Sequence, residues 1–183
     1  KYFAAELVKL NPEAMVYCSS GTFSELKKTV PAGNLVEISE YTGTKEMPAG
    51  LVKTLHPKVH SGILADLNDK EQKSYIESIN AVAFDLVVVN LYPFSAAAQE
   101  GGSIEKARTN IDIGGVSLIE AAVKNFLRVA VIVSPVDYER ILTALKSNNG
   151  SCELGFRIEL ARYAIDYAAS YLNHVSSYFG KLT

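Results

Sequence analysis

The sequence predicts an α/β fold with a doubly wound, mostly parallel sheet and helices on both faces. Short apolar runs alternate with segments of helical periodicity, and these runs are Ala14–Cys18, Leu35–Ile38, Asp85–Asn90 and Val129–Val133. Within the third run, Leu86 to Val89 shows no polar–apolar alternation, which is typical of a parallel strand buried on both faces. Strands that alternate with helices in this way form parallel sheets covered by helices.

Helical periodicity and chain breakers divide the rest of the sequence. The predicted helices are Tyr2–Leu10, Phe23–Val30, Asp69–Ile79, Ser103–Arg108, Gly114–Phe126 and Tyr138–Lys146, with one or two more over Leu154–Tyr178. Asn11-Pro12 ends the first helix, and Glu40–Gly50 is polar and rich in turn residues. No repeat or linker interrupts the pattern, so residues 1–183 are predicted to form one domain.

Composition excludes several classes of function. A chain of 183 residues with a net charge of −2 is large enough for a core and has no basic footprint for nucleic acid. No apolar run is long enough to span a membrane. Cys18 and Cys152 match no metal spacing, which favours reduced thiols in the cytoplasm and argues against a protein-held metal.

The segment Val52–Leu64 contains several polar side chains between apolar residues. These are Lys53, Thr54, His56, Lys58 and His60. Such insertions are often functional loops, although solvated loop charges are the commoner case. His56 and His60 are four residues apart, a spacing that suits metal binding on a helix face. Because Pro57 between them argues against a regular helix, we do not favour a metal site there.

Two further segments follow predicted strands. Ser19–Thr22 joins a strand to a helix, and this arrangement suits a phosphate at the helix N-terminus or, more simply, a serine or threonine N-cap. Asn90 to Pro93 lies just past the carboxyl end of a buried strand, which is the edge where open α/β sheets bind ligands.

Three strings occur together and in order: Lys53-Thr54-Leu55-His56-Pro57, Asp85 to Phe94, and Asn110 to Gly115 with Ala121-Ala122-Val123-Lys124-Asn125. Through these motifs, the chain resembles the inosine-monophosphate cyclohydrolase domain of the bifunctional purine-biosynthesis enzymes (AICAR transformylase/IMP cyclohydrolase). The resemblance extends over nearly the whole chain. The resemblance implies a methylglyoxal-synthase-like fold. It also implies a cytoplasmic, homodimeric enzyme that closes the purine ring of formamido-imidazole-carboxamide ribotide, with loss of water and without a cofactor.

The resemblance also implies roles for individual residues. The catalytic residues would be Lys53, Tyr92, Asp112 and Lys124, with Lys124 in proton transfer. The nucleotide would contact Ser19, Ser20, Gly21, Thr22, Thr54, Asn90, Leu91, Ile113 and Gly114.

Simpler explanations exist for several of these residues. Lys124 lies four residues after Glu120, which fits a surface ion pair on a helix. Asp112 fits a helix cap. Tyr92, before a proline, fits side-chain packing.

The sequence departs from the family at several positions. Leu51 replaces an arginine that helps to hold phosphate, Ser20 a glycine, Glu120 an arginine and Phe126 a common histidine. The family opens with a strand bearing a serine and a lysine, so we expect the native chain to begin before Lys1. Because of these departures, the chain could alternatively be a catalytically degenerate regulatory module that binds nucleotide or phosphate. Methylglyoxal synthase itself is a more remote alternative. The predicted homodimer is also favoured by aromatic residues at Tyr163, Tyr167 and Tyr171, spaced along one helix face.

Overall fold

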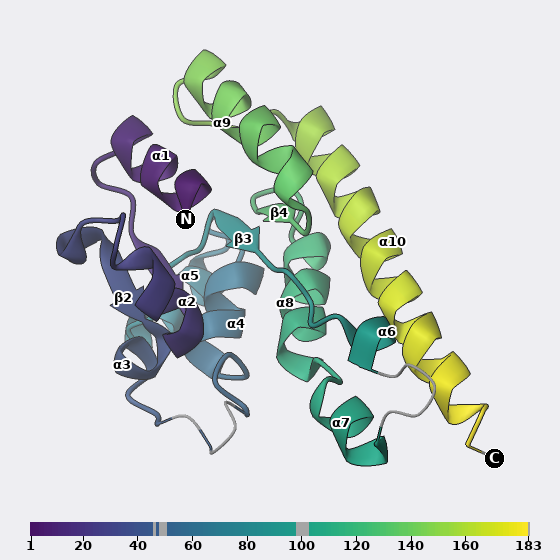
Figure 1. Cartoon of the computed structure of the whole chain (residues 1–183). Coiled ribbons are helices and arrows are strands. Elements are labelled where there is room, and N and C mark those ends of the chain that lie inside the picture. Colours follow the sequence, from purple (N-terminus) through teal and green to yellow (C-terminus); the bar gives the residue numbers. More distant parts are fainter. Residues whose placement is uncertain (46, 48–50, 98–102, 183) are drawn as a thin grey trace.

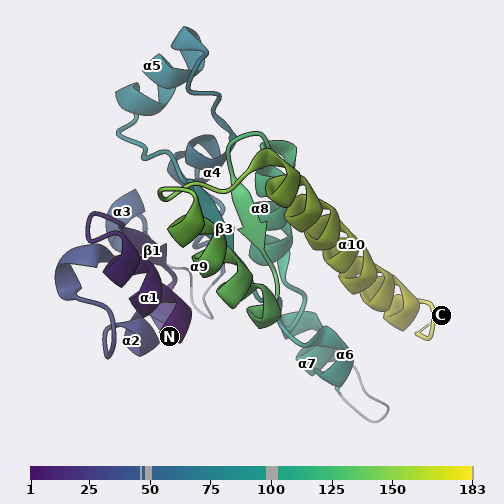
Figure 2. The same cartoon turned by 90° about the horizontal axis from the view of Figure 1, so that it is seen from above.

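The computed structural model describes residues 1–45, 47, 51–97 and 103–182. Its helices are α1 (Tyr2–Leu10), α2 (Ser20–Leu26), α3 (Ile38–Thr42), α4 (Pro57–Leu64), α5 (Lys70–Ser78), α6 (Phe94–Ala97), α7 (Ile104–Thr109), α8 (Ile113–Lys124), α9 (Tyr138–Ser147) and α10 (Leu154–Phe179). Its strands are β1 (Val16–Cys18), β2 (Leu35–Glu37), β3 (Leu86–Val88) and β4 (Ala130–Ile132), and short 3-10 turns occupy η1 (Ala32–Asn34) and η3 (Pro135–Asp137). Figures 1 and 2 show the arrangement from two directions. Of the predicted turn-rich segment Glu40–Gly50, residues 46 and 48–50 lie outside the described part.

The strands pair in parallel, which confirms the α/β class. β1 pairs with β2, with Val16 opposite Leu35, and β3 pairs with β4, with Leu86 opposite Ala130. Each pair forms its own two-stranded sheet, and no ladder joins the two within the described ranges. Among the described residues, the predicted parallel strands thus form two parallel pairs.

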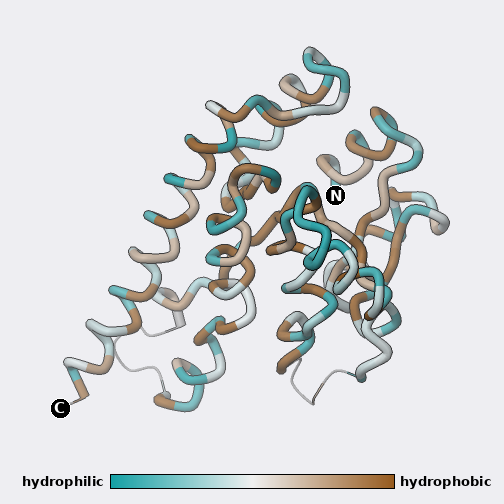
Figure 3. The backbone as a smooth tube through the Cα atoms, turned by 180° about the vertical axis from the view of Figure 1, so that it is seen from behind, coloured by the Kyte–Doolittle hydropathy of each residue, from teal (hydrophilic) through white to brown (hydrophobic). Residues whose placement is uncertain are grey.

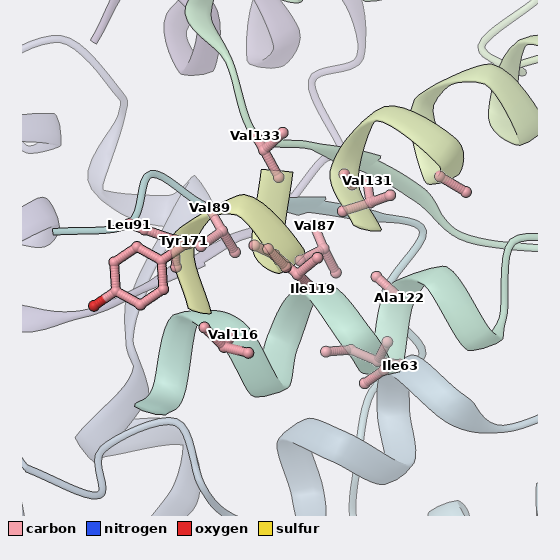
Figure 4. Packing of buried hydrophobic residues seen from close by; sticks show 14 of the residues in the cluster. Ile63, Val87, Val89, Leu91, Val116, Ile119, Ala122, Val131, Val133 and Tyr171 are labelled. Atoms are coloured by element: carbon pink, nitrogen blue, oxygen red, sulfur yellow. The ribbon is translucent and has the colours of Figure 1, made fainter. Parts of the chain in front are cut away.

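Helices cover both faces of β4, as its uninterrupted apolar run predicts, whereas β3 is covered less completely, because Val88 is 40% exposed. On one face, Val87 and Val131 pack with Ile119 and Ala122 of α8 (Figure 4). On the other face, Ala130 and Ile132 join a cluster with residues of α1, α9 and α10 (Phe3, Ile141, Leu142 and Leu160). Both faces of β4 are fully buried, as in a parallel strand between helical layers.

The long C-terminal segment is one helix, α10, which lies along α8 and ends beside α6 (Figure 1). Hydrophobic and hydrophilic residues alternate along it, as Figure 3 shows for the helix that ends near C. Its buried residues Ala161, Ala164 and Ala168 recur at helical spacing. Tyr171 is buried on the same core and Tyr167 packs against it, whereas Tyr163 is 47% exposed. Tyr171 and Tyr167 of the aromatic stripe therefore contribute to this chain's own core, and Tyr163 remains exposed.

The segment after Thr54 is helical, and the argument drawn from Pro57 was wrong. Pro57 is the first residue of α4, where its missing N–H deprives the helix of no hydrogen bond. His56 is the N-cap, and its Nδ1 accepts a hydrogen bond from the Lys58 N–H at 3.1 Å. Lys53 and Thr54 thus lead directly into a helix N-terminus.

Two local boundaries also differ from expectation. α2 begins at Ser20 and not at Phe23, so most of the predicted turn is the first turn of the helix. α3 follows β2 directly and is capped by Gly43, whose φ of 71° is a conformation that favours glycine. Across the described residues, no helix combines the length and apolar character needed to cross a membrane.

Candidate functional site

The N-terminal end of α8 brings several predicted residues together. Asp112 is the N-cap, and its Oδ1 accepts a hydrogen bond from the Gly115 N–H at 2.7 Å. A Cβ placed on Gly114 would lie 2.8 Å from Thr54 Oγ1, and a Cβ on Gly115 would lie 2.6 Å from Leu91 Cδ2. Both glycines therefore allow close approach of α8 to two other predicted contact residues.

The backbone before Lys53 adopts an unusual conformation. Val52 has a φ of 66°, in the left-handed region that β-branched residues rarely occupy. The turn is closed by a hydrogen bond from the Leu55 N–H to the Val52 carbonyl at 3.1 Å. Backbone strain of this kind concentrates at functional sites. Sequence reasoning did not single out Val52, because φ is not visible in a residue pattern.

Asn90 and Tyr92 lie past the carboxyl end of β3, as predicted. The Val89 N–H still donates to the Ile132 carbonyl at 2.9 Å, and the chain then leaves the strand pair. Asn90 Nδ2 donates to the Tyr138 hydroxyl at 3.4 Å. Tyr92 is 50% exposed, which argues against a core-packing role and leaves its ring accessible to a ligand.

The Ser19–Thr22 turn lies at the carboxyl end of β1, in the other strand pair. Ser19 occupies the N-cap position of α2, but its side chain makes no capping hydrogen bond to the backbone. Its hydroxyl instead donates to Thr22 Oγ1 at 3.3 Å. The simple side-chain cap considered from the sequence is therefore not formed, and Gly21 and Thr22 are exposed.

Lys124 lies at the opposite end of α8 from Asp112. Twelve residues at a rise of 1.5 Å separate the two by about 18 Å along the helix axis. Lys124 borders a groove of about 530 Å³ between α4 and α8, which is lined by Leu55, His56, Pro57, His60, Leu64, Ser117, Glu120, Ala121 and Lys124. Within one chain, the structure does not bring Lys124 to the residues around Asp112.

Glu120 and Lys124 are both exposed at the rim of this groove. The ion pair considered from their spacing is not among those formed by the described residues, which include pairs such as Arg108–Glu105 and Arg140–Glu159. A second hollow of about 430 Å³ lies on the surface of α5 and contains no predicted site residue. It does not compete with the α4–α8 region as a candidate site.

His60 in the same groove was considered from the sequence only as a metal ligand paired with His56. Its Nε2 is buried and has no hydrogen-bond partner among the described residues. Burial lowers the pKa of His60, although a backbone hydrogen bond with Thr54 acts in the opposite direction. The four-residue spacing from His56 was the available signal once the helix is recognised. No group of three or more His, Cys, Asp or Glu side chains in the described ranges is arranged to hold a metal ion.

Comparison with known proteins identifies the family of this chain. Residues 2–117 match the family model of the MGS-like domain, and residues 122–183 match that of the AICARFT/IMPCHase bienzyme. The bifunctional purine biosynthesis protein PurH of Magnetococcus marinus is 41% identical over 150 residues, which are 81% of this chain and 28% of that protein. The chain thus spans less than a third of this curated relative.

A solved structure shares the fold over most of both molecules. The crystal structure of ForH superimposes with a TM-score of 0.80 at 26% identity, covering 97% of this chain and 90% of ForH. The MGS-like match alone covers more than half of the chain. With its parallel strand pairs and the glycine-rich start of α8, the chain belongs to the MGS-like domain family.

Proposed function

We propose that this chain is an inosine-monophosphate cyclohydrolase domain of de novo purine biosynthesis. Its substrate would be formamido-imidazole-carboxamide ribotide, whose purine ring it closes with loss of water. The match to the AICARFT/IMPCHase bienzyme and the likeness to PurH support this activity over methylglyoxal synthase and over a degenerate regulatory module. The observation that carries the proposal is the approach of Thr54 and Leu91 to the Asp112-capped start of α8.

Ring closure needs a proton acceptor and a site for developing negative charge. The carboxamide nitrogen attacks the formyl carbon and loses a proton, and negative charge develops on the formyl oxygen. This oxygen takes up two protons, which balance one lost by the carboxamide nitrogen and one lost by the formamide nitrogen, and it leaves as water as the ring C=N bond forms. Asp112 Oδ1 is engaged by the Gly115 N–H, which leaves Oδ2 to accept the proton from the nitrogen. The first backbone N–H groups of α8, at Ile113 and Gly114, are suited to stabilise the oxygen.

The other predicted residues would hold the nucleotide. Asn90, Leu91 and the exposed ring of Tyr92 would contact the base, and the Lys53 ammonium would add positive charge beside Thr54. The phosphate would bind the turn formed by Ser19, Ser20, Gly21 and Thr22 at the start of α2. Because the reaction is intramolecular, holding the reacting conformation should supply much of the rate acceleration. No cofactor has a part in this scheme.

We also infer a homodimer in which Lys124 of one copy serves the α8 N-terminus of the other. Lys124 lies about 18 Å from Asp112 on its own helix, a distance that a lysine side chain does not span. Its exposed position at the groove rim leaves it accessible to a second molecule. Two-fold pairing would place two such lysines at two equivalent sites. We place the enzyme in the cytoplasm, in keeping with its unpaired Cys18 and Cys152.

The proposed activity is tested by incubating the purified chain with the formylated ribotide and following inosine monophosphate in the ultraviolet. Product formation at a rate proportional to protein is expected. Tight binding of inosine monophosphate in calorimetry without any turnover would instead identify a regulatory module.

Mixing two inactive variants tests the shared site. Lys124→Ala and Asp112→Asn should each lower turnover, and a one-to-one mixture should recover about a quarter of the sites through heterodimers. Lys124→Ala alone should reduce the rate roughly 10²–10⁴-fold if the ammonium donates a proton. Its free energy of unfolding should change by at most about 0.5 kcal/mol. A mixture no more active than its components, or a monomer in light scattering, would contradict the dimer model. Wild-type turnover of Lys124→Ala would remove Lys124 from the mechanism.

A further inference from the structure

Tyr171 connects α10 to the segment that leads into α8. Its side chain is buried, with 7% relative exposure. The hydroxyl accepts a hydrogen bond from the Asp112 N–H at 2.7 Å and donates one to the Asn110 carbonyl at 2.9 Å. One hydroxyl group thus binds a donor and an acceptor on the same loop, immediately before the helix whose N-terminus is the candidate site.

The ring of Tyr171 is held from the core side. It packs edge-on against Phe94, with ring centroids 6.2 Å apart, and Phe94 itself is only 2% exposed. Figure 4 shows the ring at the edge of the buried cluster, with the hydroxyl directed away from the labelled valines. Burial raises the pKa of Tyr171, so the hydroxyl keeps the proton that it donates to Asn110 at neutral pH.

The loop held by Tyr171 has little freedom to shift. On its α8 side, Gly114 lies against Thr54 Oγ1 and Gly115 against both Leu91 and the Asp112 carboxylate, so closely that not even a methyl group would fit. A displacement of the Asp112 backbone therefore alters the carboxylate, the first N–H groups of α8 and the Thr54 contact together. Displacements of about 1 Å are enough to cost roughly a hundredfold in rate.

We propose that Tyr171 is a positioning residue for the reaction at the start of α8. Its hydroxyl sets the backbone of Asn110 and Asp112, so that the Asp112 carboxylate and the N–H groups of Ile113 and Gly114 face the reacting formamide. Tyr171 itself acts through Asp112. This role rests on the proposed ring-closing function, and it gives α10 a part in the site although the helix carries none of the motif residues.

The test is Tyr171→Phe, which keeps the ring and removes only the hydroxyl. Tyr163→Phe is the matched control, because Tyr163 lies on the same helix and is 47% exposed. We expect kcat for ring closure to fall about tenfold to a hundredfold in Tyr171→Phe, with KM nearly unchanged. Tyr163→Phe should behave as wild type. Assays are run well below the melting temperature of both variants, and wild-type kcat in folded Tyr171→Phe would overturn the proposal.

Hydrogen exchange supplies a readout that does not depend on activity. Without its hydroxyl partner, the Asp112 amide should exchange faster in Tyr171→Phe than in wild type or Tyr163→Phe. Unchanged exchange at Asp112 would contradict the positioning role directly. If the wild-type chain closes no ring, the proposed function fails, and the exchange comparison still decides whether Tyr171 holds the loop.

Discussion

The two ends of α8 use polar side chains in opposite ways. At the N-terminal end, Asp112 caps the helix with one carboxylate oxygen, and close glycine contacts keep other side chains near the free N–H groups. Just past the C-terminal end, Asn125 and Arg128 donate to the backbone carbonyls of Gly62, Ile63, Ala65 and Phe84. The Arg128 side chain is only 16% exposed, and the carbonyls around the end of α4 engage its guanidinium.

In the proposed function, the N-terminal end of α8 is the binding end, and the C-terminal end anchors the helix to its neighbours. Arg128 lies between α8 and β4 and donates to the Gly62 carbonyl in α4 and to the Phe84 carbonyl before β3. It also lies 3.7 Å from the Asp85 carboxylate, so its charge is engaged within the chain. At the start of α8, the backbone donors of the first turn and one carboxylate oxygen remain available. Substitutions at the two ends should therefore separate activity from stability.

The largest expected effect is on activity, at Asp112. Asparagine caps helices as well as aspartate does, so Asp112→Asn should cost at most about 1 kcal/mol of stability through the lost charge. Loss of the proton acceptor should lower kcat roughly 10²–10⁴-fold. The control is Asp69→Asn, since Asp69 caps α5 by accepting from the Glu71 and Gln72 N–H groups far from the site. Equal turnover of the two variants would exclude Asp112 as the base.

At the other end, Arg128→Ala should mainly destabilise the fold. It leaves several carbonyls near the end of α4 without their charged donor, and each buried unsatisfied group costs roughly 1–3 kcal/mol. We expect a loss of at least about 3 kcal/mol in urea unfolding, with turnover per folded molecule close to wild type. Arg108→Ala, which removes only an exposed ion pair with Glu105, should leave the urea midpoint nearly unchanged. Reduced turnover of folded Arg128→Ala would contradict the view that the C-terminal end of α8 affects stability and not activity.

Gly115→Ala probes how closely the N-terminal end is packed. The new methyl group would meet Leu91 Cδ2 at 2.6 Å and Asp112 Oδ2 at 2.8 Å. We expect a net destabilisation of about 1–3 kcal/mol from overpacking, measured by thermal melting, together with reduced turnover. Gly155→Ala in α10 meets nothing within 4 Å and should be neutral or slightly stabilising. If neither substitution changes the free energy of unfolding, close packing at Gly115 does not limit the size of the side chain at that position.

Leu51→Arg is expected to strengthen the binding of the nucleotide phosphate. Leu51 is 51% exposed, so replacing it should not disturb the core. A new charge-assisted hydrogen bond to phosphate should tighten the binding of inosine monophosphate by about tenfold or more, as measured by calorimetry. Leu51→Gln, which has no charge, should give less. An unchanged dissociation constant for Leu51→Arg would mean that the phosphate is held elsewhere.

The smallest effect concerns pH and the groove along α4 and α8. Burial lowers the folded-state pKa of His60 below its usual 6.5, so protonation favours the unfolded chain. The stabilising effect of the neutral ring is complete above about pH 6.5 and is lost as the pH falls below that value. Urea midpoints at pH 7.5 and 5.5 should therefore differ less in His60→Gln than in wild type. His174→Gln, at an exposed position, should follow wild type, and identical pH dependence in all three proteins would contradict this assignment.

Sequence reasoning worked where the physical cause was local. Uninterrupted apolar runs located β3 and β4, and helical periodicity located α8 and α10. Asp112 was recognised as a possible cap because cap residues have a local signature. The α4 helix was missed because Pro57 was treated as an interior breaker, although proline favours the first helical position.

The remaining features depend on distance in space. The separation of Lys124 from Asp112 follows from helix geometry alone and needed only the helix boundaries. The division into two strand pairs, the conformation of Val52 and the hydrogen bonds of Tyr171 depend on tertiary packing. The available hint of a specific hydroxyl contact was that Tyr171 follows the buried Ala161, Ala164 and Ala168 along α10.

The Tyr171 hydrogen bonds also bear on the order of events during synthesis. Tyr171 follows Asp112 by 59 residues. At a translation rate of roughly 5–20 residues per second, it leaves the ribosome about 3–12 s after Asp112. During that interval, α8 and the strands can already form while the loop before α8 has no hydroxyl to hold it. The start of α8 is therefore synthesised before α10, which supplies the hydroxyl that holds Asp112.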